Sequence, residues 1–170
     1  MDFASEHFRR LARYNTWANE RLYQACGRLP EAEYLKPRPA FFKSIHGTLN
    51  HILVGDRIWM GRFTHREAGI RALNQQLYGD YIALHVARQA EDAQIQTFVD
   101  GLAPADYAAP LEYKNMSGAP FRQPLGLVLA HFFNHQTHHR GQVHDLLSQT
   151  AVPPPELDLI LFVRGEPVRT

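Results

Sequence analysis

The sequence of 170 residues contains a single cysteine, Cys26. One cysteine excludes an internal disulfide and any metal site built from several thiolates. No uninterrupted apolar run approaches the roughly 20 residues that a membrane-spanning helix needs, so we expect no membrane partner. The first residues, Met-Asp-Phe-Ala-Ser-Glu-His-Phe, lack the basic and apolar regions of a secretory signal peptide. These absences predict a cytoplasmic protein.

An excess of charge of one sign is also missing. The chain has 18 Lys and Arg against 17 Asp and Glu, a formal net charge of +1, and no long basic run. Nucleic acid is therefore not an expected partner. A hydrophobic content of 45% and a charged content of 21% are ordinary for a globular protein. The length fits one domain, which we place at residues 1–170.

Four long segments show the apolar spacing of amphipathic helices. They cover residues 2–26, 44–63, 80–102 and 123–148. Four helices of about 20 residues predict an all-α fold, a four-helix bundle. The long second and third connections act as crossovers and permit a topology other than simple up-down-up-down.

The connections differ in composition. Residues 30–42 hold three prolines and read as a loop, and residues 64–79 form a polar linker. Alternating apolar and polar residues at 111–114 indicate a short hairpin within the stretch 103–121. The apolar tail at 157–162 is expected to pack back onto the bundle.

Two histidines four residues apart, His135 and His139, lie in the run His131-Phe-Phe-Asn-His-Gln-Thr-His-His-Arg-Gly-Gln142. A helical projection puts His139 near the middle of the apolar stripe and His135 toward its edge. Spacing of four places both rings over the same turn, where they can point at one ion. His51, in the second helical segment, has Gly47 and Gly55 one turn away. Such small neighbours predict free space for an ion and part of a substrate.

Three imidazoles can hold one divalent metal and leave a coordination position open, as catalytic zinc sites do. Imidazole also suits nickel, copper and iron, so the spacing does not choose the metal. The alternative is that the three are core histidines satisfied by hydrogen bonds, as a lone buried histidine usually is. A third histidine on another apolar helix favours the metal, and the spacing supports His51 least.

Other polar residues receive simpler interpretations. Asp56, Arg57 and Arg140 are expected as surface or capping charges. Asn134 or Asp158 could orient a ligand imidazole by accepting a hydrogen bond from it.

The chain resembles the DinB-like (damage-inducible, YfiT-like) bundle proteins. The resemblance is carried by Tyr14-Asn-Thr-Trp-Ala-Asn19, by Leu49-Asn-His-Ile-Leu-Val-Gly-Asp-Arg-Ile-Trp59, by the histidine run and by Pro153-Pro-Pro-Glu-Leu-Asp158. It implies a four-helix bundle, often a homodimer, with one metal ligand from the second long helix and two from the fourth. On this sequence those positions are His51, His135 and His139. Some relatives carry a carboxylate at the position of His135.

Characterised members of the family include thiol-dependent transferases and a mycothiol-dependent maleylpyruvate isomerase. The resemblance therefore implies a zinc or nickel enzyme that acts on a small-molecule substrate, an S-transferase or isomerase using a low-molecular-weight thiol. A metal-dependent hydrolase is one alternative, although the fourth helix has no Glu between His131 and Asp145 to act as a general base. A non-enzymatic metal-binding stress protein is the other.

Overall fold

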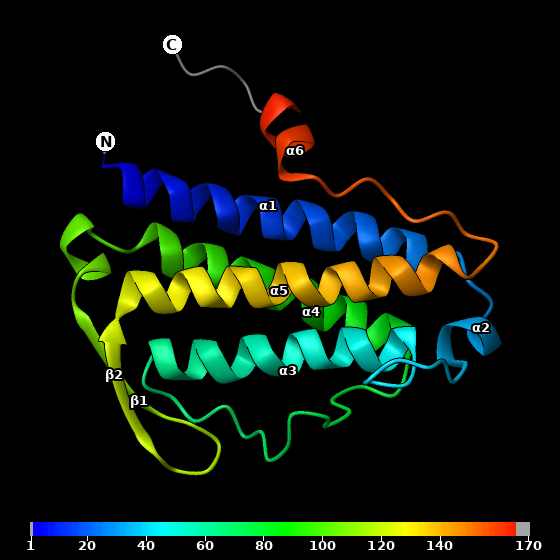
Figure 1. The fold of residues 1–170 in the computed structure, drawn as a ribbon, viewed down its shortest axis with the longest axis horizontal. Coiled ribbons are helices and arrows are strands. Elements are labelled where there is room, and N and C mark those ends of the chain that lie inside the picture. Colours follow the sequence, from blue (N-terminus) through cyan, green and yellow to red (C-terminus); the bar gives the residue numbers. More distant parts are fainter. Residues whose placement is uncertain (1, 166–170) are drawn as a thin grey trace.

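The structure, a computed structural model, describes residues 2–165 and is dominated by four long helices (Figure 1). These are α1 (Phe3–Cys26), α3 (Ile45–Phe63), α4 (Tyr81–Asp100) and α5 (Leu125–Ser148). The shorter elements are α2 (Glu31–Leu35), the 3-10 helix η1 (Pro104–Tyr107), α6 (Leu159–Gly165) and a hairpin of β1 (Pro110–Lys114) and β2 (Pro120–Pro124). The all-α bundle predicted from the sequence is confirmed.

The bundle does not place consecutive helices side by side. Helix α1 packs against α4 and α5, and α3 packs against the same two helices, so α1 and α3 lie on a diagonal. The linker 64–80 runs back along the length of α3 before α4 begins, so α3 and α4 run in the same direction (Figure 1). The topology is thus up-down-down-up, which the long connections allowed.

Side-chain caps fix the starts of three helices. Asp2, Ser44 and Asp80 accept hydrogen bonds from the backbone N–H groups three residues further on, at 3.2, 2.9 and 2.9 Å. Such caps satisfy N–H groups that have no partner inside the helix. They explain why these boundaries agree with the sequence to within a residue.

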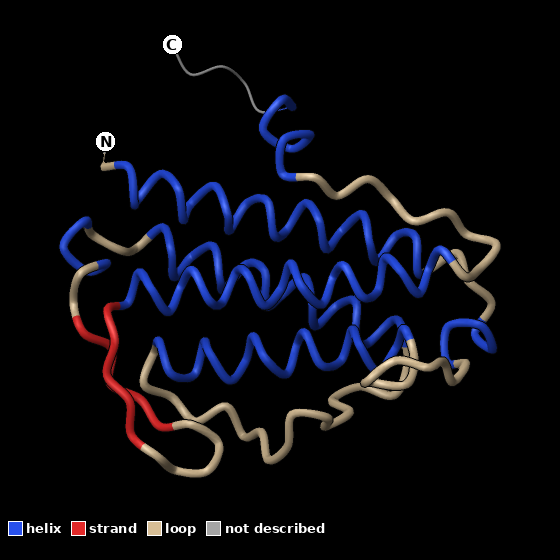
Figure 2. The backbone as a smooth tube through the Cα atoms, in the orientation of Figure 1, coloured by secondary structure: helices blue, strands red, loops and turns tan. Residues whose placement is uncertain are grey.

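The fourth helix starts later than the predicted residue 123. Gln123 and Pro124 belong to β2, where they pair with Leu111 and Pro110 of β1 (Figure 2). The hairpin predicted at 111–114 is present, but its second strand extends into the expected helix. Gln123 stays extended because the residue before a proline is disfavoured in the helical conformation, so the helix begins only after Pro124. The first loop also differs from prediction, since it contains the short helix α2.

Two apolar clusters fill the ends of the bundle, and a polar layer separates them. One cluster includes Leu22, Leu53 and Leu147, and the other includes Phe8, Ile95 and Phe132. Along each long helix, a group of buried polar residues lies between the positions that enter the two clusters. This group includes Asn15, Asn19, Asp56, Arg88, Asp92, Gln136 and Arg140. The expectation that Asp56 and Arg140 are surface or capping charges is therefore wrong.

Arg88 lies at the centre of this polar layer. Its side chain is 2% exposed and forms ion pairs with Asp56 at 2.5 Å and with Asp92 at 2.9 Å. Asn15 and Asn19 donate hydrogen bonds to Asp92 at 2.8 and 3.0 Å. Buried charges are tolerated when they are paired and hydrogen-bonded in this way. The layer therefore links α3 to α4 by an ion pair, and α1 to α4 by hydrogen bonds from neutral amides.

The C-terminal tail packs onto α1, as predicted. Tyr14 donates a hydrogen bond to the carbonyl oxygen of Leu157 at 2.7 Å. The ring of Phe162 lies against Tyr14 and Trp17, with centroids 6.0 and 5.8 Å away. None of the helices within residues 2–165 combines the length and apolarity that crossing a bilayer requires.

Candidate metal centre

The structure brings the three predicted histidines together where α3 faces α5. One ring nitrogen from each of His51, His135 and His139 lies within 4.8 Å of the other two. His51 and His139 are buried and His135 is half-buried. Two ligands that bind zinc at 2.0–2.1 Å in tetrahedral geometry lie about 3.3 Å apart. The Nε2 atoms of His51 and His139, 3.1 Å apart, already have this separation, and the set as a whole could hold one small ion.

Hydrogen bonds on the outer side of two rings fix their tautomers. Nδ1 of His51 lies 2.8 Å from the carbonyl oxygen of Leu73, which can only accept, so this nitrogen carries the proton. Nδ1 of His139 lies 2.8 Å from Oε1 of Gln142, while the amide nitrogen of Gln142 faces His138. In a neutral imidazole the other nitrogen then has a lone pair and no proton.

The two unprotonated nitrogens face each other. Nε2 of His51 and Nε2 of His139 are 3.1 Å apart. With both Nδ1 atoms protonated, neither Nε2 can donate to the other, and two lone pairs at this distance repel. A cation shared between them removes that repulsion, and this arrangement of outer hydrogen bonds is the usual one around histidine ligands. The donor set therefore fits a metal better than it fits a histidine pair satisfied by mutual hydrogen bonding.

His135 completes the set from the preceding turn of α5, on the same face as His139. Its ring centroid lies 4.4 Å from that of His139 and 5.3 Å from that of His51. Its Nδ1 is buried and has no hydrogen-bond partner within residues 2–165. A buried nitrogen without a partner costs free energy unless something binds the ring.

The two glycines near His51 have roles other than the predicted one. A Cβ at Gly55 would lie 2.8 Å from the ring of His135, and a Cβ at Gly47 would lie 2.1 Å from the carbonyl oxygen of Phe42. Gly55 therefore makes room for the ring of the third histidine, and Gly47 makes room for the chain entering α3. The expectation that these glycines leave space for substrate is wrong.

Phe42 covers one side of the site. Its ring stacks on His51 with centroids 3.7 Å apart and an interplanar angle of 16°. It also meets His139 edge-on at 5.6 Å. An aromatic cover excludes water from this side of the histidines and lowers the local dielectric constant.

Burial depresses the basicity of the cluster. It lowers the pKa of His135 to about 3, with further lowering by the neighbouring imidazoles of His139 and His51. Burial lowers the pKa of His139 to about 4, although the hydrogen bond to Gln142 raises this pKa. Burial also lowers the pKa of His51. The three rings are therefore neutral at pH 7, which is the form that binds metal.

Acid is expected to destabilise the metal-free protein below about pH 6.5. Unfolded histidines titrate near 6.5, so between that value and the folded pKa values of about 4 and about 3 the unfolded chain binds more protons. Stability contributed by the neutral rings is present above pH 6.5 and is lost as the pH falls. One pKa unit corresponds to about 1.4 kcal/mol. We expect the free energy of unfolding to fall by at least about 2 kcal/mol between pH 7.5 and pH 4.5.

Urea unfolding of the metal-free protein at several pH values measures this fall. Burial raises the pKa of Asp56 to about 6. Protonation of this carboxyl therefore raises the free energy of unfolding as the pH falls, opposite to the effect of the histidines. A variant with both His135→Gln and His139→Gln keeps that contribution and serves as the reference. An identical pH dependence in this variant and the wild type would contradict the assignment to the histidines.

The residues that orient the ligands were not predicted. Asn134 and Asp158 are exposed, and the imidazoles are held instead by Gln142 and by the carbonyl of Leu73. Gln142 is three residues after His139, one helical turn, so its position was readable from the sequence. The role of Leu73 could not be read from the sequence, because a backbone carbonyl in a long linker carries no sequence signal.

Arg57 also departs from the expectation of a surface or capping charge. It is half-buried, and its Nε lies 3.3 Å from a carboxylate oxygen of the buried Glu91. Its guanidinium also donates to the hydroxyl of Tyr78 at 2.9 Å. Arg57 thereby ties α3 to α4 and to the end of the linker that covers His51.

Comparison with known proteins gives the same family as the sequence motifs. The model of the DinB family matches residues 4–169. The chain is also similar to Protein DinB of Bacillus subtilis (strain 168), with 27% identity over 161 residues, 91% of this chain and 93% of that protein. The family match spans the four long helices and all three histidines of the site. The chain therefore belongs to the DinB family.

Proposed function

We propose that this protein is a divalent-metal-dependent enzyme, an S-transferase or isomerase that uses a low-molecular-weight thiol. The observation that carries the proposal is the set of three converging imidazoles, two of which have their unprotonated Nε2 atoms turned inward. Within residues 2–165 no other His, Cys, Asp or Glu joins this cluster. Three protein ligands leave a position for an exogenous ligand, as in catalytic sites.

Zinc or nickel is the proposed metal, because both accept neutral imidazole ligands. When bound, such an ion lowers the pKa of a thiol or water that takes the open position. His51 and His139 are held in orientation by Leu73 and Gln142. Phe42 shields one side of the rings from water. The chain thus supplies a rigid, partly dry set of donors.

The protein's own thiol does not suit this role. Cys26 is 1% exposed and packs in the apolar cluster with Leu22 and Tyr34. Burial raises the pKa of Cys26 to about 12, so its thiol stays protonated and unreactive. A thiol at the open position would therefore come from a small molecule.

Two buried carboxylates of the bundle are paired with cations. Asp56, on the same helix as His51, is paired with Arg88, and Glu91 is paired with Arg57. Metal-dependent hydrolases commonly place a free carboxylate beside the metal as general base, and no carboxylate among the described residues belongs to the histidine cluster, which favours thiol chemistry over hydrolysis.

The proposal is tested with cobalt-substituted protein. Titration with glutathione, cysteine and other physiological thiols is expected to produce a sulfur-to-metal charge-transfer band with one of them. Turnover of a reactive electrophile should depend on the same thiol. His138→Ala is the matched control, because His138 is exposed and adjacent to His139, and this variant should keep both signals.

Two results would overturn the proposal. Cleavage of an ester or amide at a metal-dependent rate, without any thiol effect on the cobalt spectrum, would establish the hydrolase alternative. Stoichiometric metal binding with no thiol effect and no turnover would support a non-enzymatic metal-binding protein.

We also propose that the chain forms a homodimer through the outer face of α5. Leu127, His131, Asn134, His138 and Gly141 recur at helical spacing and are all exposed. A Cβ at Gly141 would meet nothing within 4 Å among the described residues, so this face is open to a second helix.

Sedimentation equilibrium should give twice the 19.5 kDa of one chain, and Gly141→Glu should shift the protein toward the monomer. A wild-type monomer at micromolar concentration would contradict the prediction.

A further inference from the structure

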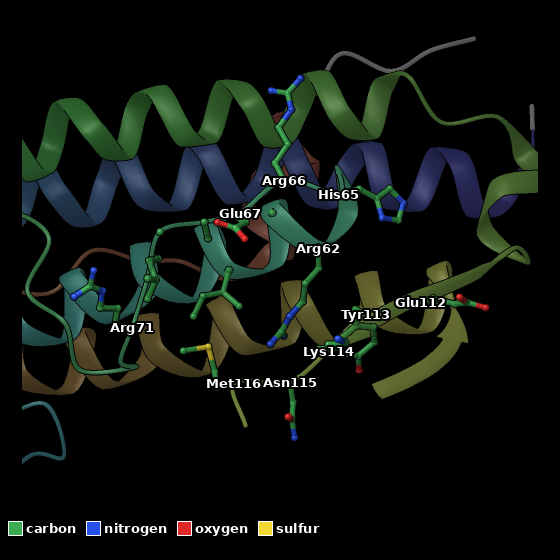
Figure 3. A pocket seen from close by; sticks show the side chains of 15 residues that line it. Arg62, His65, Arg66, Glu67, Arg71, Glu112, Tyr113, Lys114, Asn115 and Met116 are labelled. Carbon is green, nitrogen blue, oxygen red and sulfur yellow. The ribbon is translucent and has the colours of Figure 1, made fainter. Parts of the chain in front are cut away.

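A concave site lies apart from the histidines. It is a pocket of about 760 Å³ between the C-terminal half of α3, the start of the following linker and the β-hairpin (Figure 3). Its walls include Ile58 and Arg62 of α3, residues 65–71 of the linker and residues 112–116 of the hairpin. This size is typical of pockets that hold small molecules.

Close backbone packing forms one wall of the pocket. The backbone N–H of Arg66 donates to the carbonyl of Gly61 at 2.8 Å. A Cβ at Gly61 would lie 2.7 Å from the carbonyl oxygen of Arg66, so glycine allows the linker to lie directly on α3. The wall is therefore part of the folded structure.

Cationic side chains predominate around the pocket. Arg62, Arg66, Arg71 and Lys114 line it, against the carboxylates of Glu67 and Glu112. Glu112 is already engaged by Arg122, at 3.3 Å. The pocket thus has an excess of positive charge, although the whole chain is nearly neutral.

Arg62 is the cation that the structure positions most firmly. Its guanidinium lies over the ring of Trp59 at 4.3 Å and over the ring of Tyr113 at 5.1 Å. In Figure 3 its side chain extends from α3 toward the hairpin, whereas Arg66 points away from it. Within residues 2–165, Arg62 forms no ion pair or hydrogen bond through its side chain.

An arginine held in this way is prepared to bind an anion. The guanidinium is half-buried, and burial lowers the pKa of Arg62, although arginine remains protonated at neutral pH. Its side chain has already lost rotamer freedom to the two aromatic rings, so less conformational entropy is lost on binding. Its planar fork of donors matches the oxygens of a carboxylate or phosphate.

The pocket also offers an apolar surface beside this cation. Ile58, Ala68, Ile70, Tyr113 and Met116 are among its lining residues. An inorganic ion alone would leave these side chains uncovered. We propose that this pocket binds a small organic anion, with its carboxylate or phosphate on Arg62 and its apolar body against these side chains.

The anion site is separate from the metal centre but shares a helix face with it. Arg62 follows His51 by 11 residues, which is close to three full turns, about 16 Å along the axis of α3. A bound anion therefore need not touch the histidines. Binding can be measured on metal-free and metal-loaded protein alike, so failure of the proposed metal chemistry would leave the anion site intact.

Benzoate, phenyl phosphate and neutral benzamide are suitable probes, because they share one ring and differ in the head group. Backbone amide shifts of the full chain, followed by NMR during titration, locate the site. We expect benzoate or phenyl phosphate to shift amides within residues 61–71 and 112–116, and the tighter of the two identifies the head group. Benzamide should bind at least about tenfold more weakly, equivalent to about 1.4 kcal/mol.

Arg62→Gln should weaken binding of the anions at least about tenfold as well. The matched control is Arg21→Gln, since Arg21 also lies over a tryptophan, Trp17, at 4.7 Å but does not line this pocket. This control should bind as the wild type does. Shifts confined to other regions, or equal affinity for benzamide and benzoate, would overturn the proposal without any variant. Equal affinity of Arg62→Gln and wild type would overturn it too.

Discussion

Replacement of His135 by alanine is expected to weaken metal binding by more than about 100-fold. Loss of a residue that only orients a ligand commonly costs 10–100-fold, and His135 is itself one of the three converging donors. Its removal would leave two imidazoles, His51 and His139, to hold the ion. Metal content after dialysis, and affinity by competition with a chelator, measure the effect.

His138→Ala is the matched control for this prediction. His138 is in the same motif, and its ring centroid lies 4.8 Å from that of His139. It is nevertheless exposed and outside the converging set. This variant should retain full metal content, because Gln142 still accepts from Nδ1 of His139 after its exposed contact with His138 is lost. Metal loss in His138→Ala together with retention in His135→Ala would show that the ligand assignment is wrong.

Gln142→Leu should weaken metal binding less than His135→Ala does and more than His138→Ala does. This change removes the acceptor for Nδ1–H of His139 while leaving all three ligands in place. We expect a 10–100-fold loss of metal affinity, the range typical of residues that orient a ligand. An unchanged affinity would mean that Gln142 does not fix the tautomer of His139.

Arg88→Met is expected to lower the free energy of unfolding by about 3–5 kcal/mol, the usual cost of removing one partner of a buried ion pair. The change leaves Asp56 and Asp92, at 0% and 3% exposed, without their shared cation in the bundle interior. Urea unfolding at pH 7.5 measures the loss. Combining Arg88→Met with Asp56→Asn should recover part of the lost free energy of unfolding, because one of the two unpaired buried carboxylates is then absent.

Arg122→Met is the control for this second prediction. Arg122 also pairs with a carboxylate, that of Glu112, but the two side chains are 66% and 76% exposed. An exposed pair contributes at most about 1 kcal/mol, so this variant should be nearly as stable as the wild type. A similar small effect for Arg88→Met would show that the interior charges are not coupled as the distances indicate.

Local signals in the sequence determined the helices and the candidate ligands. Capping residues such as Ser44 and Asp80 mark where a helix starts, because they satisfy backbone groups within one turn. The spacing of His135 and His139 places them one turn apart on the same face of the helix, since four residues exceed one turn only slightly. These features depend on neighbours in the chain, so they can be read without knowing the fold.

Contacts between distant segments required the tertiary structure. The sequence did not show that Asp56 and Arg140 are buried, because their charges are tolerable only beside partners on other helices, such as Arg88 and Asn15. It also did not show that Gly55 makes room for His135, which is 80 residues away in the chain.

The convergence of His51 with the pair on α5 was the least secure part of the sequence interpretation, and only the packing of α3 against α5 decided it. The orientation of His51 depends on a backbone carbonyl of the linker, at Leu73, and any residue type supplies the same carbonyl. The pocket around Arg62 arises in the same way, where a linker and a hairpin meet the end of a helix. Periodicity reports what one helix buries, whereas a site shared by several elements depends on how those elements pack.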